Sequence, residues 1–181
     1  MTTLMTAVLT ELTAAIRTEL GAASNAEERA QRVAAALAPF LRHADLLPSA
    51  QLEPDPLRYR QHLLHAEPDG SFSVVALVWL PGQTTSVHDH TSWCVVGTYL
   101  GAEEETVYRL AVEADRTVLV PVGTTVHPAG AVTYVTPPGD IHRVRNATTE
   151  KTVSIHVYGV DVSLSGTSIR RTYDQPVLTA G

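Results

Sequence analysis

The sequence is poor in the features that would cross-link the chain, anchor it in a membrane or attract polyanions. Among 181 residues there is one cysteine, Cys94, so no internal disulfide can form, and a reducing, cytoplasmic setting is expected. The net charge of −6 and the lack of a basic run argue against nucleic acid as the main partner. No apolar run approaches membrane-spanning length, and residues 1–5 do not start a signal peptide, so we expect no membrane partner.

The first third of the chain has helical character. Apolar residues recur at helical spacing over residues 4–20, and Gly21 is expected to end that helix. Residues 24–27 fit a capping box for a second, alanine-rich helix that runs to Phe40. Residues 48–56 form a proline-rich connector. We therefore expect a helical lead-in over residues 1–56 and a main body over 57–181.

The main body consists of short β-branched and aromatic runs separated by turn signals. Turns are expected around residues 68–70, 81–82, 101, 123, 128–130 and 138–139. Many short strands at close spacing predict a mainly β fold, either a barrel or a jelly roll. The expected strands are residues 59–65, 71–79, 94–100, 105–110, 117–122, 132–136, 142–146 and 152–158.

Two histidine-containing segments predict a metal site. His88 and His90 lie two apart in an extended segment, so both imidazoles can point to one side of it. That pair alone is equally consistent with polar strand residues. A proline–glycine turn at Pro138-Gly139 then delivers His142 at the start of another strand. Three neutral imidazoles that converge on one point form a metal site with open positions.

The spacing of these segments resembles the two cupin motifs. Gly82, His88, His90, Cys94 and Gly101 follow one another with five, one, three and six residues between them, which looks like the first motif. That motif usually has glutamate where this chain has Cys94. The second motif is matched by the positions Gly130, Pro137, Gly139, His142 and Asn146. The resemblance implies a double-stranded β-helix with a metal inside the barrel, preceded here by a pair of α-helices.

Loss of the motif glutamate is similar to the thiol dioxygenases of the cysteine dioxygenase family. The resemblance covers roughly residues 59–173. It implies one Fe(II) per chain, held by His88, His90 and His142, with O2 as co-substrate. The implied reaction adds both oxygen atoms to the sulfur of a small thiol carboxylate and yields a sulfinic acid.

A third polar segment supports this resemblance. Ser154, His156 and Tyr158 alternate with apolar residues, so they share one face of a strand. Taken alone, the segment reads as an ordinary amphipathic strand. If the polar face lines the barrel, the three groups should satisfy one another, because an unpaired buried hydroxyl costs about 1–3 kcal/mol. The trio is similar to the catalytic Ser–His–Tyr relay of the thiol dioxygenases.

The substrate class depends on Gln61 and on two arginines. In cysteine dioxygenases a position similar to Gln61 is an arginine that pairs with the substrate carboxylate. Glutamine there resembles the 3-mercaptopropionate dioxygenases, in which an arginine beyond the relay tyrosine takes that role. The resemblance assigns Arg171 first and Arg170 second, and a guanidinium suits a carboxylate because it can form two parallel hydrogen bonds. Arg60 should point away from the site because it neighbours Gln61 in an extended run.

Two further side chains have open interpretations. Cys94 could form a thioether with Tyr158, as some cysteine dioxygenases do, or it could be a small buried hydrophobe. Trp93 is expected in the core or the pocket wall. The other histidines are expected at packing or surface positions: His43, His62, His65 and His127.

The expected function is therefore a thiol dioxygenase acting on a 3-mercaptopropionate-like acid. Cysteine and mercaptosuccinate remain alternative substrates. A cupin isomerase is disfavoured because Asp89, the nearest carboxylate, should face away from the metal. A barrel that binds metal without catalysis is the alternative of another class. The sequence leaves the oligomeric state open.

Overall fold

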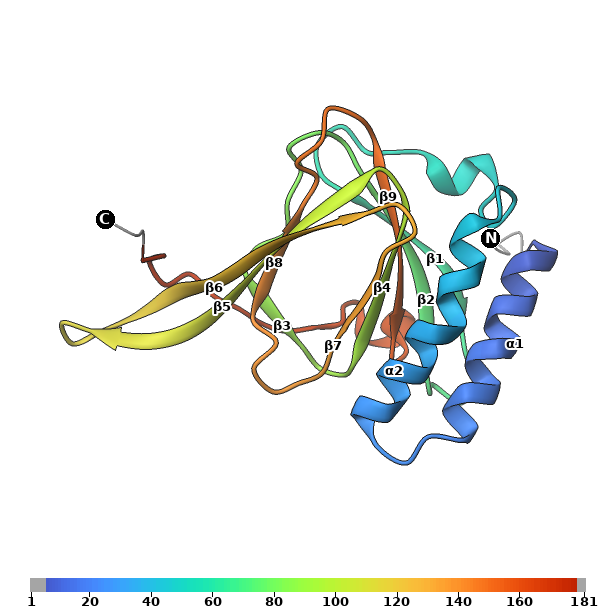
Figure 1. Cartoon of the computed structure of the whole chain (residues 1–181), viewed down its shortest axis with the longest axis horizontal. Coiled ribbons are helices and arrows are strands. Elements are labelled where there is room, and N and C mark those ends of the chain that lie inside the picture. Colours follow the sequence, from blue (N-terminus) through green and yellow to red (C-terminus); the bar gives the residue numbers. More distant parts are fainter. Residues whose placement is uncertain (1–5, 179–181) are drawn as a thin grey trace.

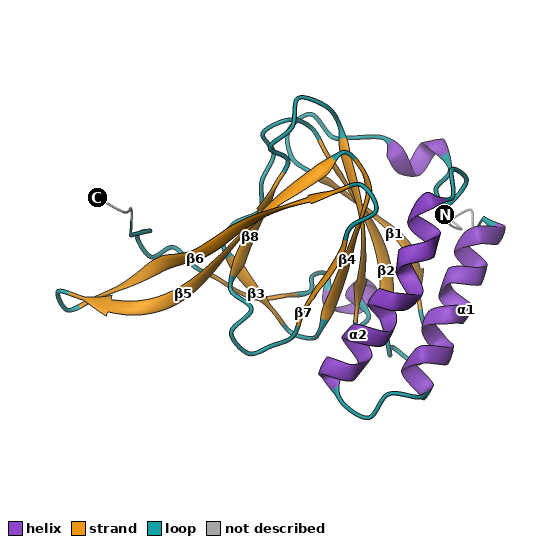
Figure 2. Cartoon of the chain, viewed as in Figure 1, coloured by secondary structure: helices purple, strands orange, loops and turns teal. Residues whose placement is uncertain are grey.

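The computed structural model describes residues 6–178 as a two-sheet β-barrel on which the helices α1 and α2 pack (Figures 1 and 2). A short third helix, α3, spans Val162–Ser165. Helix α1 spans Ala7–Gly21, and its N-cap Thr6 accepts a hydrogen bond from the Leu9 amide. Leu4, the first residue expected in this helix, and the expected absence of a signal peptide over residues 1–5 lie outside the described residues. None of the described helices is long and apolar enough to cross a membrane.

The second helix, α2, spans Ala26–Leu37, and its start differs from the expected capping box. The N-cap is Asn25, which accepts from the Glu28 amide, while Glu28 in turn accepts from the backbone and hydroxyl of Ser24. The predicted end at Phe40 is wrong because the chain tightens into a 3-10 helix, η1, over Ala38–Arg42. A second 3-10 turn, η2 (Ser49–Leu52), lies inside the proline-rich connector.

Two five-stranded antiparallel sheets form the barrel, which confirms the mainly β prediction. The first sheet has the order β1-β2-β9-β4-β7 and the second the order β10-β3-β8-β5-β6. The strands of the first sheet are β1 (Arg60–Ala66), β2 (Ser73–Trp79), β9 (Thr152–Tyr158), β4 (Cys94–Leu100) and β7 (Val132–Val135). The strands of the second sheet are β10 (Ile169–Thr172), β3 (His88–His90), β8 (His142–Arg145), β5 (Ala102–Glu113) and β6 (Arg116–Pro128).

Strands β5 and β6 are much longer than the sequence predicted. They form the arm that extends to the left of the barrel in Figure 1. The expected turn at Gly123 is wrong, since Gly123 pairs with Val107 inside the ladder. The chain reverses instead at Ala114 and Asp115, which have φ values of 46° and 64°. Such a two-residue turn matches the twist of a hairpin, although neither residue is a glycine.

The helices cover the outer face of the first sheet. Val153, Ile155 and Val157 of β9 point to that face and are fully buried in one apolar core with residues of α1 and α2. Strand alternation therefore sends the intervening residues of β9 into the barrel. A second apolar cluster, which includes Leu77, Trp79 and Val144, fills the interior between the sheets. The predicted division of the chain into a helical lead-in over residues 1–56 and a main body over residues 57–181 stays a prediction.

Candidate metal centre and its pocket

Three histidines converge in the barrel interior. His88 and His90 stand on the short strand β3, and His142 on β8 pairs directly with His88, so all three rings share one face of the sheet. Their centroids are 4.7 to 5.0 Å apart, and a set of one ring nitrogen from each lies within 4.8 Å of one another. The side chains are at most 5% exposed. The predicted convergence is thus present.

Each of these rings is oriented through its Nδ1 atom. His88 Nδ1 lies 2.9 Å from the Ser86 carbonyl oxygen, and His90 Nδ1 lies 2.9 Å from the Asp140 carboxylate. His142 Nδ1 lies 2.5 Å from the carboxylate of Glu105. Acceptors at Nδ1 fix the tautomer that leaves Nε2 unprotonated, which is the form that ligates a metal.

The donor set fits a metal ion. His142 Nε2 is buried and has no hydrogen-bond partner among the described residues. Burial and the neighbouring His142 and His90 lower the pKa of His88 to about 3, so this ring is neutral at physiological pH. Imidazole nitrogens suit iron, zinc and copper, and three such ligands leave positions open for other groups. His88, His90 and His142 would hold the ion.

Two buried carboxylates that the sequence analysis did not single out support the ligands. Burial raises the pKa of Glu105, but hydrogen bonds from His127 and His142 outweigh it and lower that pKa to about 2. Burial likewise raises the pKa of Asp140, but the hydrogen bond with the His90 ring, backbone hydrogen bonds and the charge of His90 together outweigh it and lower that pKa. His127, expected at a packing or surface position, lies with its Nε2 3.1 Å from Glu105. These contacts keep both carboxylates charged beside the ligands.

Removal of Glu105 is expected to weaken metal binding without removing a ligand. Glu105→Ala frees the ring of His142, and loss of such a partner typically lowers metal affinity about 10–100-fold. Competition of the protein with a chelator for Fe(II) measures the change. Glu104→Ala is the matched control, because Glu104 points to the opposite face and pairs with Arg145. Equal affinities in the two variants would contradict the supporting role.

The predicted relay is assembled on β9 beside the histidines. Tyr158 Oη lies 3.2 Å from His156 Nδ1, and His156 Nε2 lies 2.9 Å from Ser154 Oγ. Burial, together with the nearby histidines, lowers the pKa of His156 to about 3, so this ring is neutral. Burial raises the pKa of Tyr158 well above its usual value, which keeps the phenol protonated. The side chains of the trio are therefore uncharged and are linked by two hydrogen bonds.

The three imidazoles open onto a cavity between the two sheets. Its wall includes all three imidazoles together with His156, Tyr158 and Cys94. Gln61 also lines it, as the sequence predicted, with Tyr59 and Trp79 stacked at 4.5 Å between ring centroids. Among the described residues, no arginine, lysine, aspartate or glutamate lines this cavity.

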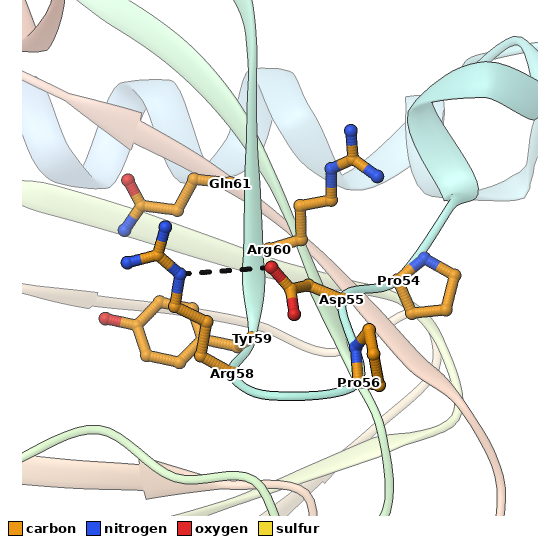
Figure 3. Close-up of a pocket in the computed structure, with 7 residues that line it drawn as sticks. All are labelled: Pro54, Asp55, Pro56, Arg58, Tyr59, Arg60 and Gln61. Atoms are coloured by element: carbon orange, nitrogen blue, oxygen red, sulfur yellow. Dashed lines mark ion pairs between the residues drawn. The ribbon is translucent and has the colours of Figure 1, made fainter.

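Figure 3 shows a broader surface pocket that shares Tyr59 and Gln61 with this cavity. Arg58 lines this surface pocket together with Gln61, and its Nε lies 3.9 Å from the carboxylate of Asp55. Arg60 leaves the strand on the opposite side from Gln61, in agreement with the sequence-based expectation. Gln61 therefore lines both the surface pocket and the interior cavity that the three histidines face.

The structure does not bring Arg170 or Arg171 to the cavity. A bulge between Ile169 and Arg171 shifts the register of β10 so that Arg171 pairs with Asp89. Directly paired residues share a face, and Asp89 points away from the flanking histidines, as expected.

Each of the two arginines has another partner on that outer side of the sheet. Arg170 forms an ion pair with Asp89, and the Arg171 guanidinium lies 4.7 Å from the ring centroid of Tyr173. The structure therefore places both arginines away from the cavity lining, and the assignment of Arg171 or Arg170 to the substrate carboxylate stays a prediction.

Trp93 lies in the apolar core with the helices and is not among the residues that line the cavity. Trp79 is the tryptophan of the wall, and its Nε1 donates to Ser154 at 3.2 Å. Cys94 and Tyr158 are direct partners across β4 and β9, so their side chains share a face. A thioether between them stays a prediction.

Comparison with known proteins identifies related sequences and folds. A profile of the family named cysteine dioxygenase type I matches residues 14–165. Cysteine dioxygenase type 1 of Danio rerio is 31% identical over 123 residues, which cover 67% of this chain and 58% of the relative. The human protein of the same name is 30% identical over 106 residues, 58% of this chain and 52% of the relative. The chain thus matches little more than half the length of these relatives.

Among solved structures, an uncharacterised protein with a double-stranded β-helix domain from Klebsiella pneumoniae matches with a TM-score of 0.51. It is 16% identical, and the match covers 66% of this chain and 92% of that one. This likeness concerns the fold alone and agrees with the predicted cupin barrel.

Proposed function

The chain belongs to the cysteine dioxygenase type I family, and from this premise we propose that it is an Fe(II)-dependent thiol dioxygenase. The proposed reaction adds both atoms of O2 to the sulfur of a small mercapto-carboxylic acid and gives a sulfinic acid. The observation that carries the proposal is the set of three buried imidazoles that face one cavity. Fe(II) bound there would supply a soft site for the thiolate and the one-electron chemistry of O2.

The residues of the chain position the reactants and hold protons. Asp140 and Glu105 keep the rings of His90 and His142 in the ligating tautomer. The Tyr158 hydroxyl can donate a hydrogen bond into the cavity, and His156 fixes where that hydroxyl lies. Leu77, Val96 and Val144 form apolar parts of the wall and limit access of water. A restricted, oriented site of this kind lowers the entropic cost of bringing thiol and O2 together.

The lining of the cavity favours a thiol that lacks an amino group. Cysteine carries an ammonium, and a buried ammonium needs a carboxylate or several acceptors. No acidic side chain lines the described cavity, whereas neutral donors such as Gln61, Tyr59 and Ser168 do. We therefore propose 3-mercaptopropionate as the representative substrate. Its carboxylate would extend toward Gln61 and the surface pocket, which Arg58 and Arg60 also line.

A panel of thiols tests this function. Oxygen uptake by the Fe(II)-loaded chain is expected to be fastest, in kcat/KM, with 3-mercaptopropionate. Cysteine, mercaptosuccinate and cysteamine should be slower, the last because it has no carboxylate. A preference for cysteine would support the alternative cysteine dioxygenase assignment. Tight zinc binding with no thiol-dependent oxygen uptake would instead indicate a metal-binding barrel without this activity.

A further inference from the structure

Glu103 is a buried acid that the proposed reaction has not used. Three consecutive glutamates occupy β5, and alternation places Glu104 outside, where it pairs with Arg145. Glu103 and Glu105 point inward. Glu105 is paired with His142 and His127, whereas Glu103 is 2% exposed and its Oε1 has no partner among the described residues. Burial of an ionised carboxylate without partners costs free energy, and this cost falls when the carboxyl is protonated or hydrogen-bonded.

Glu103 reaches the far end of the relay. Burial raises its pKa from 4.5 to about 7, and a side-chain hydrogen bond with Ser154 opposes that rise. Ser154 Oγ also accepts from Trp79 Nε1 at 3.2 Å and contacts His156 Nε2 at 2.9 Å. The hydrogen-bonded chain is therefore one group longer than the Ser–His–Tyr trio, and it ends at an acid.

We propose that the protonation state of Glu103 sets the direction of every hydrogen bond in this chain and so decides where the Tyr158 hydroxyl proton points. The argument rests on counting donors. A hydroxyl has one proton and two lone pairs, an indole N–H only donates, and a neutral imidazole has one donor and one acceptor. Because Trp79 always donates to Ser154, one lone pair of that hydroxyl is permanently occupied.

An ionised Glu103 accepts hydrogen bonds only. Ser154 then donates its proton to Glu103 and accepts from His156 Nε2–H with its second lone pair. His156 Nδ1 is left as an acceptor and takes the hydrogen bond from Tyr158 Oη. In this state the Tyr158 proton is directed at His156 and away from the cavity.

A protonated Glu103 reverses the chain. Its O–H donates to Ser154, whose two lone pairs are then filled by Glu103 and Trp79. Ser154 must donate to His156 Nε2, and His156 Nδ1–H donates to Tyr158 Oη. The Tyr158 proton is then released from His156 and points to the cavity side, where it can donate to Ser168, its other hydrogen-bond partner, or to a ligand. Glu103 is thus a positioning residue that acts through Ser154 and His156.

Other ionisable groups face Glu103 from the neighbouring strands and modulate its proton affinity. His127 on β6 and His142 on β8 lower its pKa, and the adjacent Glu105 raises it. The remaining ionisable neighbours are Cys94 on β4 and Tyr158 on β9. Both of these have strongly raised pKa values, so they stay neutral while Glu103 titrates.

The tautomer of His156 reports the direction of the chain. In the 181-residue chain loaded with zinc, which is diamagnetic, nitrogen-15 NMR of the histidines is followed over about two pH units either side of pH 7. His156 is expected to change from the Nδ1–H tautomer at low pH to the Nε2–H tautomer at high pH, with a midpoint near the Glu103 pKa of about 7. Glu103→Gln, an isosteric change, should abolish that transition, and Glu104→Gln should leave it intact.

A single His156 tautomer throughout this range in the unmodified chain, or the same transition in Glu103→Gln, would overturn the inference. The catalytic consequence rests on the proposed function: the pH profile of kcat should lose an inflection near 7 in Glu103→Gln alone. Failure of the Glu103 inference and failure of the proposed dioxygenase function give different results. If the chain has no thiol-dependent oxygen uptake, the NMR transition still decides the role of Glu103.

Discussion

Replacement of His142 by alanine is expected to abolish both Fe(II) retention and thiol-dependent oxygen uptake. His142 Nε2 is a buried ring nitrogen without a hydrogen-bond partner in the part of the chain that the structure describes, and it faces His88 and His90 at the centre of the site. Its removal leaves two imidazoles, which cannot hold a divalent ion at the affinity of three. His88→Ala and His90→Ala should have the same effect. Metal analysis after gel filtration, with oxygen uptake on the same samples, measures both.

His127→Ala is the matched control for this loss. His127 is also a histidine that contacts Glu105, yet it is not one of the three converging ligands. It should retain Fe(II) at near-stoichiometric occupancy, although with reduced affinity, because Glu105 loses one of its two partners. Full occupancy in His142→Ala would contradict the assignment of the ligand set.

The second large effect is expected from Tyr158→Phe, which should slow turnover while Fe(II) stays bound. The substitution removes one hydroxyl and keeps the ring that packs inside the barrel. The hydroxyl is the only part of the Ser154–His156–Tyr158 trio that can donate into the cavity, since the donors of His156 and Ser154 are used within the chain. Loss of a positioned proton donor typically lowers a rate by a factor on the order of 10²–10⁴.

Single-turnover kinetics on the Fe(II)-loaded variant separate this effect from binding. KM for 3-mercaptopropionate should change much less than kcat, because Gln61 and Tyr59, which also line the cavity, remain in place. Tyr59→Phe is the comparison variant, as it removes a hydroxyl from the same wall without touching the relay. An unchanged kcat in Tyr158→Phe would remove the relay from the mechanism.

The residues that could be predicted are those whose role follows from local spacing. His88 and His90 share a face because a strand alternates, and Ser154, His156 and Tyr158 do so for the same reason. The alternating apolar residues of β9 also fixed the orientation of that strand, since they pack under the helices. The expected bounds of β4 and β9 match the structure for this reason.

The residues that were missed depend on register between distant strands. The run of glutamates on β5 resembles a solvated charge run, and only pairing with β6 and β8 turns Glu103 and Glu105 inward. A bulge in β10 moved Arg171 to the outer face, and a bulge leaves no reliable trace in the sequence. Trp93 takes the first of its two expected positions, the core, and Trp79, which the sequence analysis did not single out, lines the cavity.

The most direct test of the account is the fate of labelled oxygen. The Fe(II)-loaded chain is given 3-mercaptopropionate under oxygen-18 gas, and the product is weighed by mass spectrometry. We expect a sulfinic acid in which both oxygens on sulfur carry the label. A product with label in one oxygen, a disulfide, or no thiol-dependent product at all would contradict the assignment of a dioxygenase.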